Sequence, residues 1–214
     1  MLLTIPGPAG PLEALLDAPR PAGAGPTAPL RAAVVFAHPH PAYGGTMHTQ
    51  AVYHGAKGLV RVGCSVLRFN FRGVGASAGV FDQGRGEVED FRSALNDMHD
   101  RFPGTRLWAA GFSFGAWVAL ETGAGDPRVS ALIGIAPPVA HQEYAFPHTL
   151  ESTKPKFFVQ GNRDELCLLK DLRGFYARCH EPKELAIIDG ASHLFDGQGC
   201  EVGDALEDLM GDFS

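Results

Sequence analysis

The sequence predicts an α/β fold built on a mostly parallel central sheet of about eight strands, with helices on both faces. Two observations support this prediction. From Ala32 onward, short apolar runs that favour strands alternate with longer runs of helical periodicity, and this order is typical of parallel strands joined by crossover helices. The chain also has 214 residues, of which 45% are hydrophobic and 20% charged, so a single domain over residues 1–214 can bury a substantial core.

The first two strands are predicted to form an antiparallel hairpin at one edge of the sheet. The runs Leu2–Ile5 and Leu12–Asp17 are joined by PGPAGP, and two such runs around a short turn rich in glycine and proline favour a hairpin. The following segment, Pro19–Pro29, has low complexity. It is interpreted as a flexible loop rather than an interdomain linker, because too little chain precedes it to form a domain.

The rest of the chain is predicted to alternate between strands and helices. The run VVFA within Ala32–Ala37 has no polar alternation, as expected for a strand buried on both faces, and Gly63 can end the first helix in a left-handed conformation. Between Ala136 and Lys154 the pattern weakens around prolines, which predicts a surface segment and leaves no room for a large cap domain. The later strands are predicted at Val66–Asn70, Leu107–Ala110, Val129–Ile135, Lys156–Gln160 and Glu184–Ile188. The helices are predicted at Met47–Arg61, Glu87–Arg101, Phe114–Thr122, Leu166–Cys179 and Asp204–Met210.

Charge and cysteine usage exclude several classes of partner. The net charge is −6 and the basic residues are scattered, so neither nucleic acid nor a membrane surface is expected as a partner. The N-terminus lacks the basic region of a signal peptide and no apolar stretch could span a bilayer, so a cytoplasmic location is expected. The four cysteines, Cys64, Cys167, Cys179 and Cys200, form no C-x-x-C pair and are interpreted as reduced, mostly packed thiols.

Two segments match Gly-x-Ser-x-Gly, the pattern of a nucleophile elbow, in which a sharp turn from a strand into a helix exposes a serine hydroxyl. They are GFSFG at 111–115 and GASAG at 75–79. Ser113 follows the apolar run RLWAA and precedes the helical run FGAWVALET, so it has the required context and lies at a helix N-terminus that favours negative charge. Ser77 lies in a glycine-rich stretch where no helix begins, and it is interpreted as a loop residue.

A serine hydroxyl needs a base to remove its proton, and this base is commonly a histidine oriented by a carboxylate. FFVQGNRDE places Asp164 after a buried strand and a turn glycine, and LAIIDGASHLF places His193 in the loop after the last strand. The carboxyl ends of parallel strands meet at one edge of a sheet, so Ser113, Asp164 and His193 are expected to converge. Glu165 is an alternative carboxylate, but the position after the turn favours Asp164, and Glu165 is expected to face solvent or to cap the next helix.

Two N–H donors are expected to stabilise the negative charge that develops on the substrate oxygen. One is the backbone N–H of Phe114, directly after the candidate nucleophile. The other should come from the loop HPHPAYGGT, whose two prolines have no N–H. This leaves His38, His40 or a later residue, and the His40 N–H is favoured.

The sequence contains parts of a metal-binding pattern and of a nucleotide-binding pattern. His38, His40 and His48 could suggest zinc, but the flanking prolines stiffen the loop and no H-x-H-x-D-H or H-E-x-x-H pattern follows. No metal is therefore expected, and His38 is interpreted as a partly buried structural residue. FNFRGVGAS lacks the third glycine and the acidic residue of a dinucleotide site, so no cofactor is expected and Arg72 is interpreted as a structural anchor of this loop.

The segments HPHPAYGG, FNFRGVGAS, GFSFGA, GNRDE and GASHLF follow one another in this order. Together they resemble the α/β-hydrolase superfamily, and more narrowly its small, lidless bacterial serine hydrolases, which are similar to dienelactone hydrolases and short-chain carboxylesterases. The resemblance runs from about Ala32 to the end of the chain. It implies an α/β-hydrolase fold, no cofactor, and a catalytic triad of Ser113, Asp164 and His193. Dienelactone hydrolases carry cysteine at the position of Ser113, and the loop reads HPHP rather than the HGGG of many lipases, which argues against a long-chain lipase.

These observations predict a serine esterase that cleaves small carboxylic esters through an acyl-enzyme intermediate. Phe112, Leu166 and Phe195 flank the site and are expected to contact a small apolar acyl group in an open, shallow pocket. The expected partner is a small-molecule ester, and the chain is expected to be a monomer or a homodimer. Two alternatives stay open: a peptidase, thioesterase or acyltransferase on the same fold, and a non-catalytic ligand-binding protein of that fold.

Overall fold

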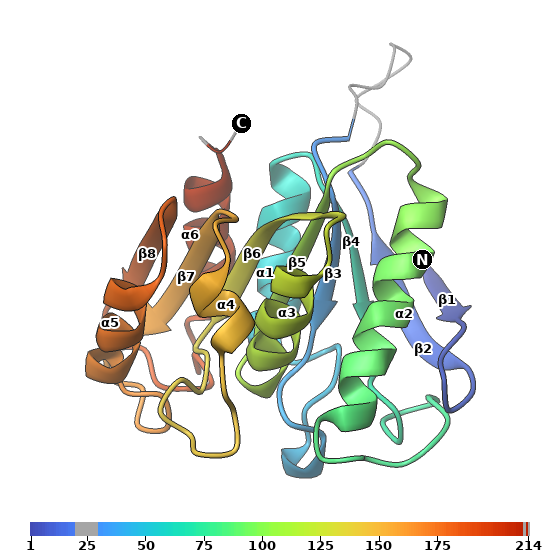
Figure 1. Ribbon diagram of the computed structural model, residues 1–214, viewed down its shortest axis with the longest axis horizontal. Coiled ribbons are helices and arrows are strands. Elements are labelled where there is room, and N and C mark those ends of the chain that lie inside the picture. Colours follow the sequence, from blue (N-terminus) through green and yellow to red (C-terminus); the bar gives the residue numbers. More distant parts are fainter. Residues whose placement is uncertain (20–29, 212, 214) are drawn as a thin grey trace.

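The computed structural model describes residues 1–19, 30–211 and 213 (Figure 1). The stretch 20–29, for which the sequence predicts a flexible loop, lies outside the described residues. The strands are β1 (Leu2–Ile5), β2 (Leu12–Asp17), β3 (Ala33–Ala37), β4 (Ser65–Phe69), β5 (Leu107–Phe112), β6 (Val129–Ile135), β7 (Lys156–Gly161) and β8 (Lys183–Ile188). The helices are α1 (Gln50–Arg61), α2 (Arg85–Arg101), α3 (Phe114–Gly125), α4 (Pro147–Glu151), α5 (Leu169–Arg178) and α6 (Gly199–Gly211), with a short 3₁₀ helix, η1, at Pro41–Tyr43.

The eight strands of the described residues form one sheet in the order β1-β2-β4-β3-β5-β6-β7-β8. Strand β2 pairs antiparallel with β1 and with β4, and every other neighbouring pair is parallel. The predicted mostly parallel sheet with an antiparallel hairpin at its edge is therefore confirmed. The parallel strands end at the lower edge in Figure 1, where the loops that follow them gather.

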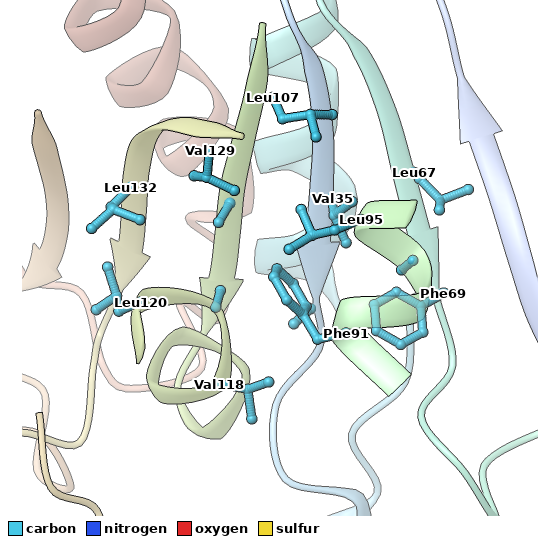
Figure 2. Close-up of a cluster of buried hydrophobic side chains, with 14 of the residues drawn as sticks. Val35, Leu67, Phe69, Phe91, Leu95, Leu107, Val118, Leu120, Val129 and Leu132 are labelled. Carbon is cyan, nitrogen blue, oxygen red and sulfur yellow. The ribbon is translucent and has the colours of Figure 1, made fainter. Parts of the chain in front are cut away.

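The sheet is covered by helices on both faces, as predicted. Helices α2, α3 and α5 lie on one face, and α1 and α6 lie on the other (Figure 1). Because side chains alternate along a strand, Val35 of β3 packs in the first cluster and Phe36 in the second. Figure 2 shows the first cluster, where Phe91 of α2 lies against Phe69 of β4, with ring centroids 6.2 Å apart. A parallel sheet buried in this way explains why its strands read as continuous apolar runs.

Four helices begin at residues other than those predicted. The helix expected from Met47 begins at Gln50, and the Met47 N–H donates to Asn70 Oδ1 at 2.8 Å. The helix expected from Glu87 begins at Arg85, the one expected from Leu166 begins at Leu169, and the one expected from Asp204 begins at Gly199. Short helix α4 falls within the surface segment whose pattern was weak, and it starts with a proline at a position that suits proline.

The segment between β6 and β7 contains only this five-residue helix, so no large cap domain is inserted there, as predicted. None of the helices in the described part of the chain combines the length and the apolar character that a bilayer span requires.

Helices α1 and α6 approach each other so closely that their contact depends on glycine. A Cβ atom added at Gly58 of α1 would lie 2.0 Å from the carbonyl oxygen of Gly203, and one added at Gly203 of α6 would lie 2.6 Å from the carbonyl oxygen of His54. Backbone atoms cannot move aside without separating the two helices.

We expect Gly58→Ala to destabilise the fold by about 2 kcal/mol or more, since the added methyl group forces the two helices apart. Gly174→Ala is the matched control, because a Cβ atom at this helical position of α5 meets nothing within 4 Å. It should raise the free energy of unfolding by about 0.5–1 kcal/mol, through the better helix propensity of alanine. Urea unfolding of both variants measures this, and equal effects would contradict the close-contact explanation.

Candidate active site

Ser113 occupies a strained turn between β5 and α3. Its backbone has φ +54° and ψ −121°, a conformation that costs a residue with a side chain on the order of 1–3 kcal/mol. The turn is held at both ends: the Ser113 N–H donates to Ile135 O of β6 at 2.9 Å, and Ser113 O accepts from Ala116 N at 2.8 Å. Ser113 thus has the conformation expected for a serine in a nucleophile elbow.

The two glycines of GFSFG are required by close backbone contacts. A Cβ atom at Gly111 would lie 2.1 Å from Gly115 O, and one at Gly115 would lie 2.4 Å from His38 O. The first contact lets α3 turn back against β5. The second brings the start of α3 against the loop that follows β3, which is the loop predicted to supply an oxyanion donor.

The structure brings the three predicted triad side chains together. The Ser113 hydroxyl lies 2.9 Å from His193 Nε2, and His193 Nδ1 lies 2.9 Å from Asp164 Oδ2. Ser113 follows β5, Asp164 follows β7 and His193 follows β8, so residues 80 positions apart meet at the carboxyl edge of the sheet. The side chains of His193 and Asp164 are buried, whereas the Ser113 residue is half-exposed. This chain of hydrogen bonds can carry a proton away from the serine hydroxyl.

Four donors satisfy the buried Asp164 carboxylate. Besides His193, these are the backbone N–H groups of Leu166 and Cys167, at 2.9 and 2.7 Å from Oδ1, and the Gln160 side-chain amide, at 2.9 Å from Oδ2. Helix α5 starts after these two contacts, at Leu169. Glu165 is exposed, so of the two adjacent carboxylates Asp164 is the one that meets the imidazole. Gln160 was not among the predicted site residues, although a polar residue inside the apolar run FFVQG was a signal.

Two backbone N–H groups lie free beside this arrangement. Phe114 is the first residue of α3, where an N–H has no partner within the helix, and His40 precedes η1. Among the hydrogen bonds of the described residues, neither N–H has an acceptor. The rings of His40 and Phe114 lie 5.0 Å apart between centroids, so these two donors come from neighbouring segments.

His38 fixes the loop after β3 from inside the protein. Its Nε2 accepts from the Phe71 N–H at 3.1 Å, and its Nδ1 lies 2.6 Å from Pro39 O. The first bond requires an unprotonated Nε2 and the second a protonated Nδ1, which together define a neutral ring. Burial lowers the pKa of His38 from 6.5 to about 4, consistent with that neutral form. The predicted structural role fits, but the ring is completely rather than partly buried.

The relationship to known proteins follows from comparisons of sequence and structure. A family model described as serine aminopeptidase, S33, matches residues 28–153. An α/β serine hydrolase homologue from Coxiella burnetii has a TM-score of 0.88 and 36% identity, over 98% of this chain and 97% of the other. The chain belongs to the α/β-hydrolase superfamily. A lidless α/β serine hydrolase from Xanthomonas campestris is similar as well, with a TM-score of 0.87 and 33% identity over 99% of this chain and 93% of the other.

The chain also has a similar sequence among curated proteins. An uncharacterized protein of Rickettsia prowazekii is 36% identical over 191 residues, which cover 86% of this chain and 80% of that protein. The family model and the two solved structures confirm the recognition of a small α/β-hydrolase in the sequence.

Two aromatic residues of the hydrolase lie differently from the expectation. Phe112 and Phe195, predicted to contact the substrate, are completely buried. Phe112 packs against the imidazole of His193, with ring centroids 5.3 Å apart, and Phe195 packs against Phe112 at 6.0 Å. Both rings therefore support the imidazole from the core side and do not present a surface to a ligand. Leu166 is 71% exposed, so its side chain is accessible at the edge of the site.

Ser77, in the second Gly-x-Ser-x-Gly segment, has a different environment in the hydrolase. Its hydroxyl donates to Asn70 O at 2.7 Å and accepts from the Glu13 N–H at 2.9 Å. Both contacts are with the backbone and the residue is buried. Ser77 therefore connects β2 to the loop after β4, in which Arg72 is anchored to Asp90 through two hydrogen bonds from its guanidinium, at 2.8 and 3.0 Å.

Two of the three histidines that could suggest zinc, His38 and His40, have ring nitrogens engaged in hydrogen bonds. Both nitrogens of His38 are used, and His40 Nδ1 accepts from the Ala42 N–H at 3.1 Å. A different group, Asp164, Cys167 and His193, has ligand-type atoms within 4.8 Å of one another. In this group His193 Nδ1 and Asp164 Oδ2 already face each other at hydrogen-bond distance, and burial raises the pKa of the Cys167 thiol well above its usual range. The geometry matches a hydrogen-bonded pair next to a neutral thiol.

The lowered pKa of His38 predicts a specific loss of stability in acid. The unfolded chain takes up a proton near pH 6.5, but the folded chain does so only near pH 4, so stability falls as the pH drops through this window. The contribution of His38 to this loss is roughly 3 kcal/mol. We expect His38→Gln, which cannot titrate, to be less stable than the wild type at pH 7 but to lose less stability between pH 6.5 and 4.5.

Urea unfolding at several pH values measures this difference, with His99→Gln as the control at an exposed position. The control should keep the wild-type pH dependence. The same slope in the wild type and in His38→Gln would show that His38 is not held neutral by the fold.

Proposed function

We propose that this α/β-hydrolase is a serine esterase that cleaves small carboxylic esters through an acyl-enzyme intermediate. The observation that carries the proposal is the continuous chain of hydrogen bonds from the Ser113 hydroxyl through His193 to Asp164, with both contacts at 2.9 Å. A serine becomes an effective nucleophile when a neighbouring base accepts its proton and a carboxylate orients that base.

In the proposed reaction, Ser113 Oγ attacks the acyl carbon while its proton passes to His193 Nε2. The resulting oxyanion accepts hydrogen bonds from the N–H groups of Phe114 and His40, and one such donor is typically worth about 3 kcal/mol of the barrier. His193 then donates its proton to the leaving alcohol, which leaves Ser113 acylated. Water repeats the sequence with the same proton transfers, so that the acid is released and the serine is restored. Asp164 keeps His193 in the required tautomer and stabilises its charged form.

The rim of the site favours an apolar substrate. Exposed apolar side chains follow several strands at the carboxyl edge of the sheet: Tyr43 is 88% exposed, Val80 76%, Leu166 71% and Leu194 52%. Leu166 and Leu194 lie within two residues of Asp164 and His193. With no large cap domain above them, these side chains are available to the acyl or alcohol group of an ester, and the open site suits short chains.

The family model's description keeps aminoacyl substrates as the second candidate. An aminopeptidase must bind a charged α-amino group, for which it needs a carboxylate close to the nucleophile. The Asp164 carboxylate is already used by four donors, which leaves the exposed carboxylates of Glu165 and Glu143 for that contact. Thioester hydrolysis and acyl transfer would use the same residues as ester hydrolysis. A panel of p-nitrophenyl esters, acyl thioesters and aminoacyl p-nitroanilides separates these reactions, and faster turnover of the anilides than of the esters would reject the esterase proposal.

We expect Ser113→Ala to lower kcat for a short p-nitrophenyl ester by about 10⁴-fold or more, since a triad without its nucleophile retains little activity. Ser77→Ala is the matched control, because it removes a serine from the same sequence pattern. It should keep the wild-type kcat and lose about 1–2 kcal/mol of stability, through the two buried hydrogen bonds of its hydroxyl.

A fluorophosphonate probe gives a second measurement on the same proteins. It should label the wild type and Ser77→Ala, but not Ser113→Ala. Wild-type activity in Ser113→Ala would reject the catalytic assignment, and a folded wild type that resists the probe would favour a non-catalytic ligand-binding protein.

A further inference from the structure

Gln160 is a buried polar residue next to the catalytic carboxylate, and the reaction proposed above gives it no role. It lies on β7, one residue before the strand ends, and has no exposed surface. Its Nε2 donates to Asp164 Oδ2 at 2.9 Å and to Cys167 O at 2.6 Å. Its Oε1 is also buried, and has no hydrogen-bond partner among the described residues.

The orientation of this amide follows from its neighbours. Both nearby atoms, a carboxylate oxygen and a carbonyl oxygen, can only accept hydrogen bonds, so the group facing them must be the NH₂. The reversed amide would place its own oxygen against the carboxylate of Asp164. Leaving Oε1 without a partner is unfavourable, and the contacts of Nε2 therefore outweigh that loss.

We infer that Gln160 is a positioning residue for the triad. This inference rests on the proposed hydrolase mechanism. Gln160 and His193 share the same carboxylate oxygen, Oδ2, while Oδ1 is held by the two backbone N–H groups of residues 166 and 167. The amide keeps Oδ2 directed at the imidazole, and its hydrogen bond stabilises part of the negative charge on this oxygen. It thereby limits how strongly Asp164 stabilises a protonated His193.

This sharing of charge affects the pH at which His193 can act as a base. The hydrogen bond from Gln160 stabilises the carboxylate most when the imidazole is neutral, because the carboxylate is then uncompensated. Without the amide, Asp164 stabilises protonated His193 more strongly. The protonated form is then more stable relative to the neutral imidazole. Activity, which requires the neutral ring, should therefore be lost at a higher pH on the acid side.

The test is the pH dependence of p-nitrophenyl acetate hydrolysis by Gln160→Met, a replacement of similar size without donor or acceptor. We expect kcat to fall about tenfold, as for one lost charge-assisted hydrogen bond, with KM unchanged. The pH of half-maximal kcat/KM on the acid side should rise by about 0.5 pH unit. Gln198→Met is the control, since the exposed Gln198 amide donates to Asp189 O on the same side of the sheet and does not reach Asp164. Both the rate and the pH profile of this control should equal those of the wild type.

Thermal unfolding of the same variants separates positioning from a structural role. If Gln160→Met is less stable but keeps the wild-type pH profile and kcat, Gln160 only fills the core and the inference is wrong. If Gln160→Met does not fold, Gln160→Leu is measured in the same way, and the same outcomes apply. Ser113→Ala is assayed in parallel: if it stays active, the proposed mechanism itself fails, whereas an inactive Ser113→Ala with an unchanged Gln160→Met profile rejects only the role of Gln160.

Discussion

The backbone conformation of Ser113 is the constraint on which the rest of the site depends. A positive φ is unfavourable for a residue with a Cβ atom, so the surrounding structure must hold it. The hydrogen bond to Ile135 O fixes the turn to β6, and the contact at Gly115 fixes the start of α3 against the loop after β3. These two contacts require β5 to lie between β3 and β6, which is the order found in the sheet. The strand order therefore contributes to the geometry of the site, because it holds Ser113 in a backbone conformation that an isolated turn would not keep.

Burial of the Asp164 carboxylate imposes the second requirement. A buried charge is destabilising unless it is fully hydrogen bonded, and here the donors come from three parts of the local structure: a strand side chain, two loop N–H groups and the imidazole. The two N–H groups lie in the loop that precedes α5. The aromatic packing of Phe112 and Phe195 then excludes solvent from the other side of His193, which strengthens its interaction with Asp164.

Much of the fold was predictable because strands buried on both faces produce apolar runs that are hard to mistake, as at Val129–Ile135, which the structure reproduces without change. The positions of Ser113, Asp164 and His193 could be located from the sequence because each follows a predicted strand, although only β5 and β7 are buried throughout and β8 is partly exposed. The start of α5 was not predictable, because the apolar pattern extends back to Leu166, whereas the helix begins at Leu169. The face on which Phe112 lies could have been found, since Trp108 and Phe112 share a side of β5 by alternation. The prediction that Phe112 contacts the substrate was based on its position next to Ser113 in the sequence. Alternation along the strand is a better guide to the direction of a side chain.

The two Gly-x-Ser-x-Gly segments show why a short pattern alone does not identify a nucleophile. Ser77 and Ser113 each have two glycine neighbours at the same spacing, and each hydroxyl makes hydrogen bonds in the folded protein. The partners differ: Ser77 bonds a carbonyl and an amide of the backbone, which cannot take up its proton, whereas Ser113 faces an imidazole nitrogen. The turn at Ser77 also leads into a loop, so no helix N-terminus adds positive potential there. The two segments are therefore distinguished by the groups that the fold brings beside each hydroxyl, which at Ser113 are an imidazole and a helix N-terminus.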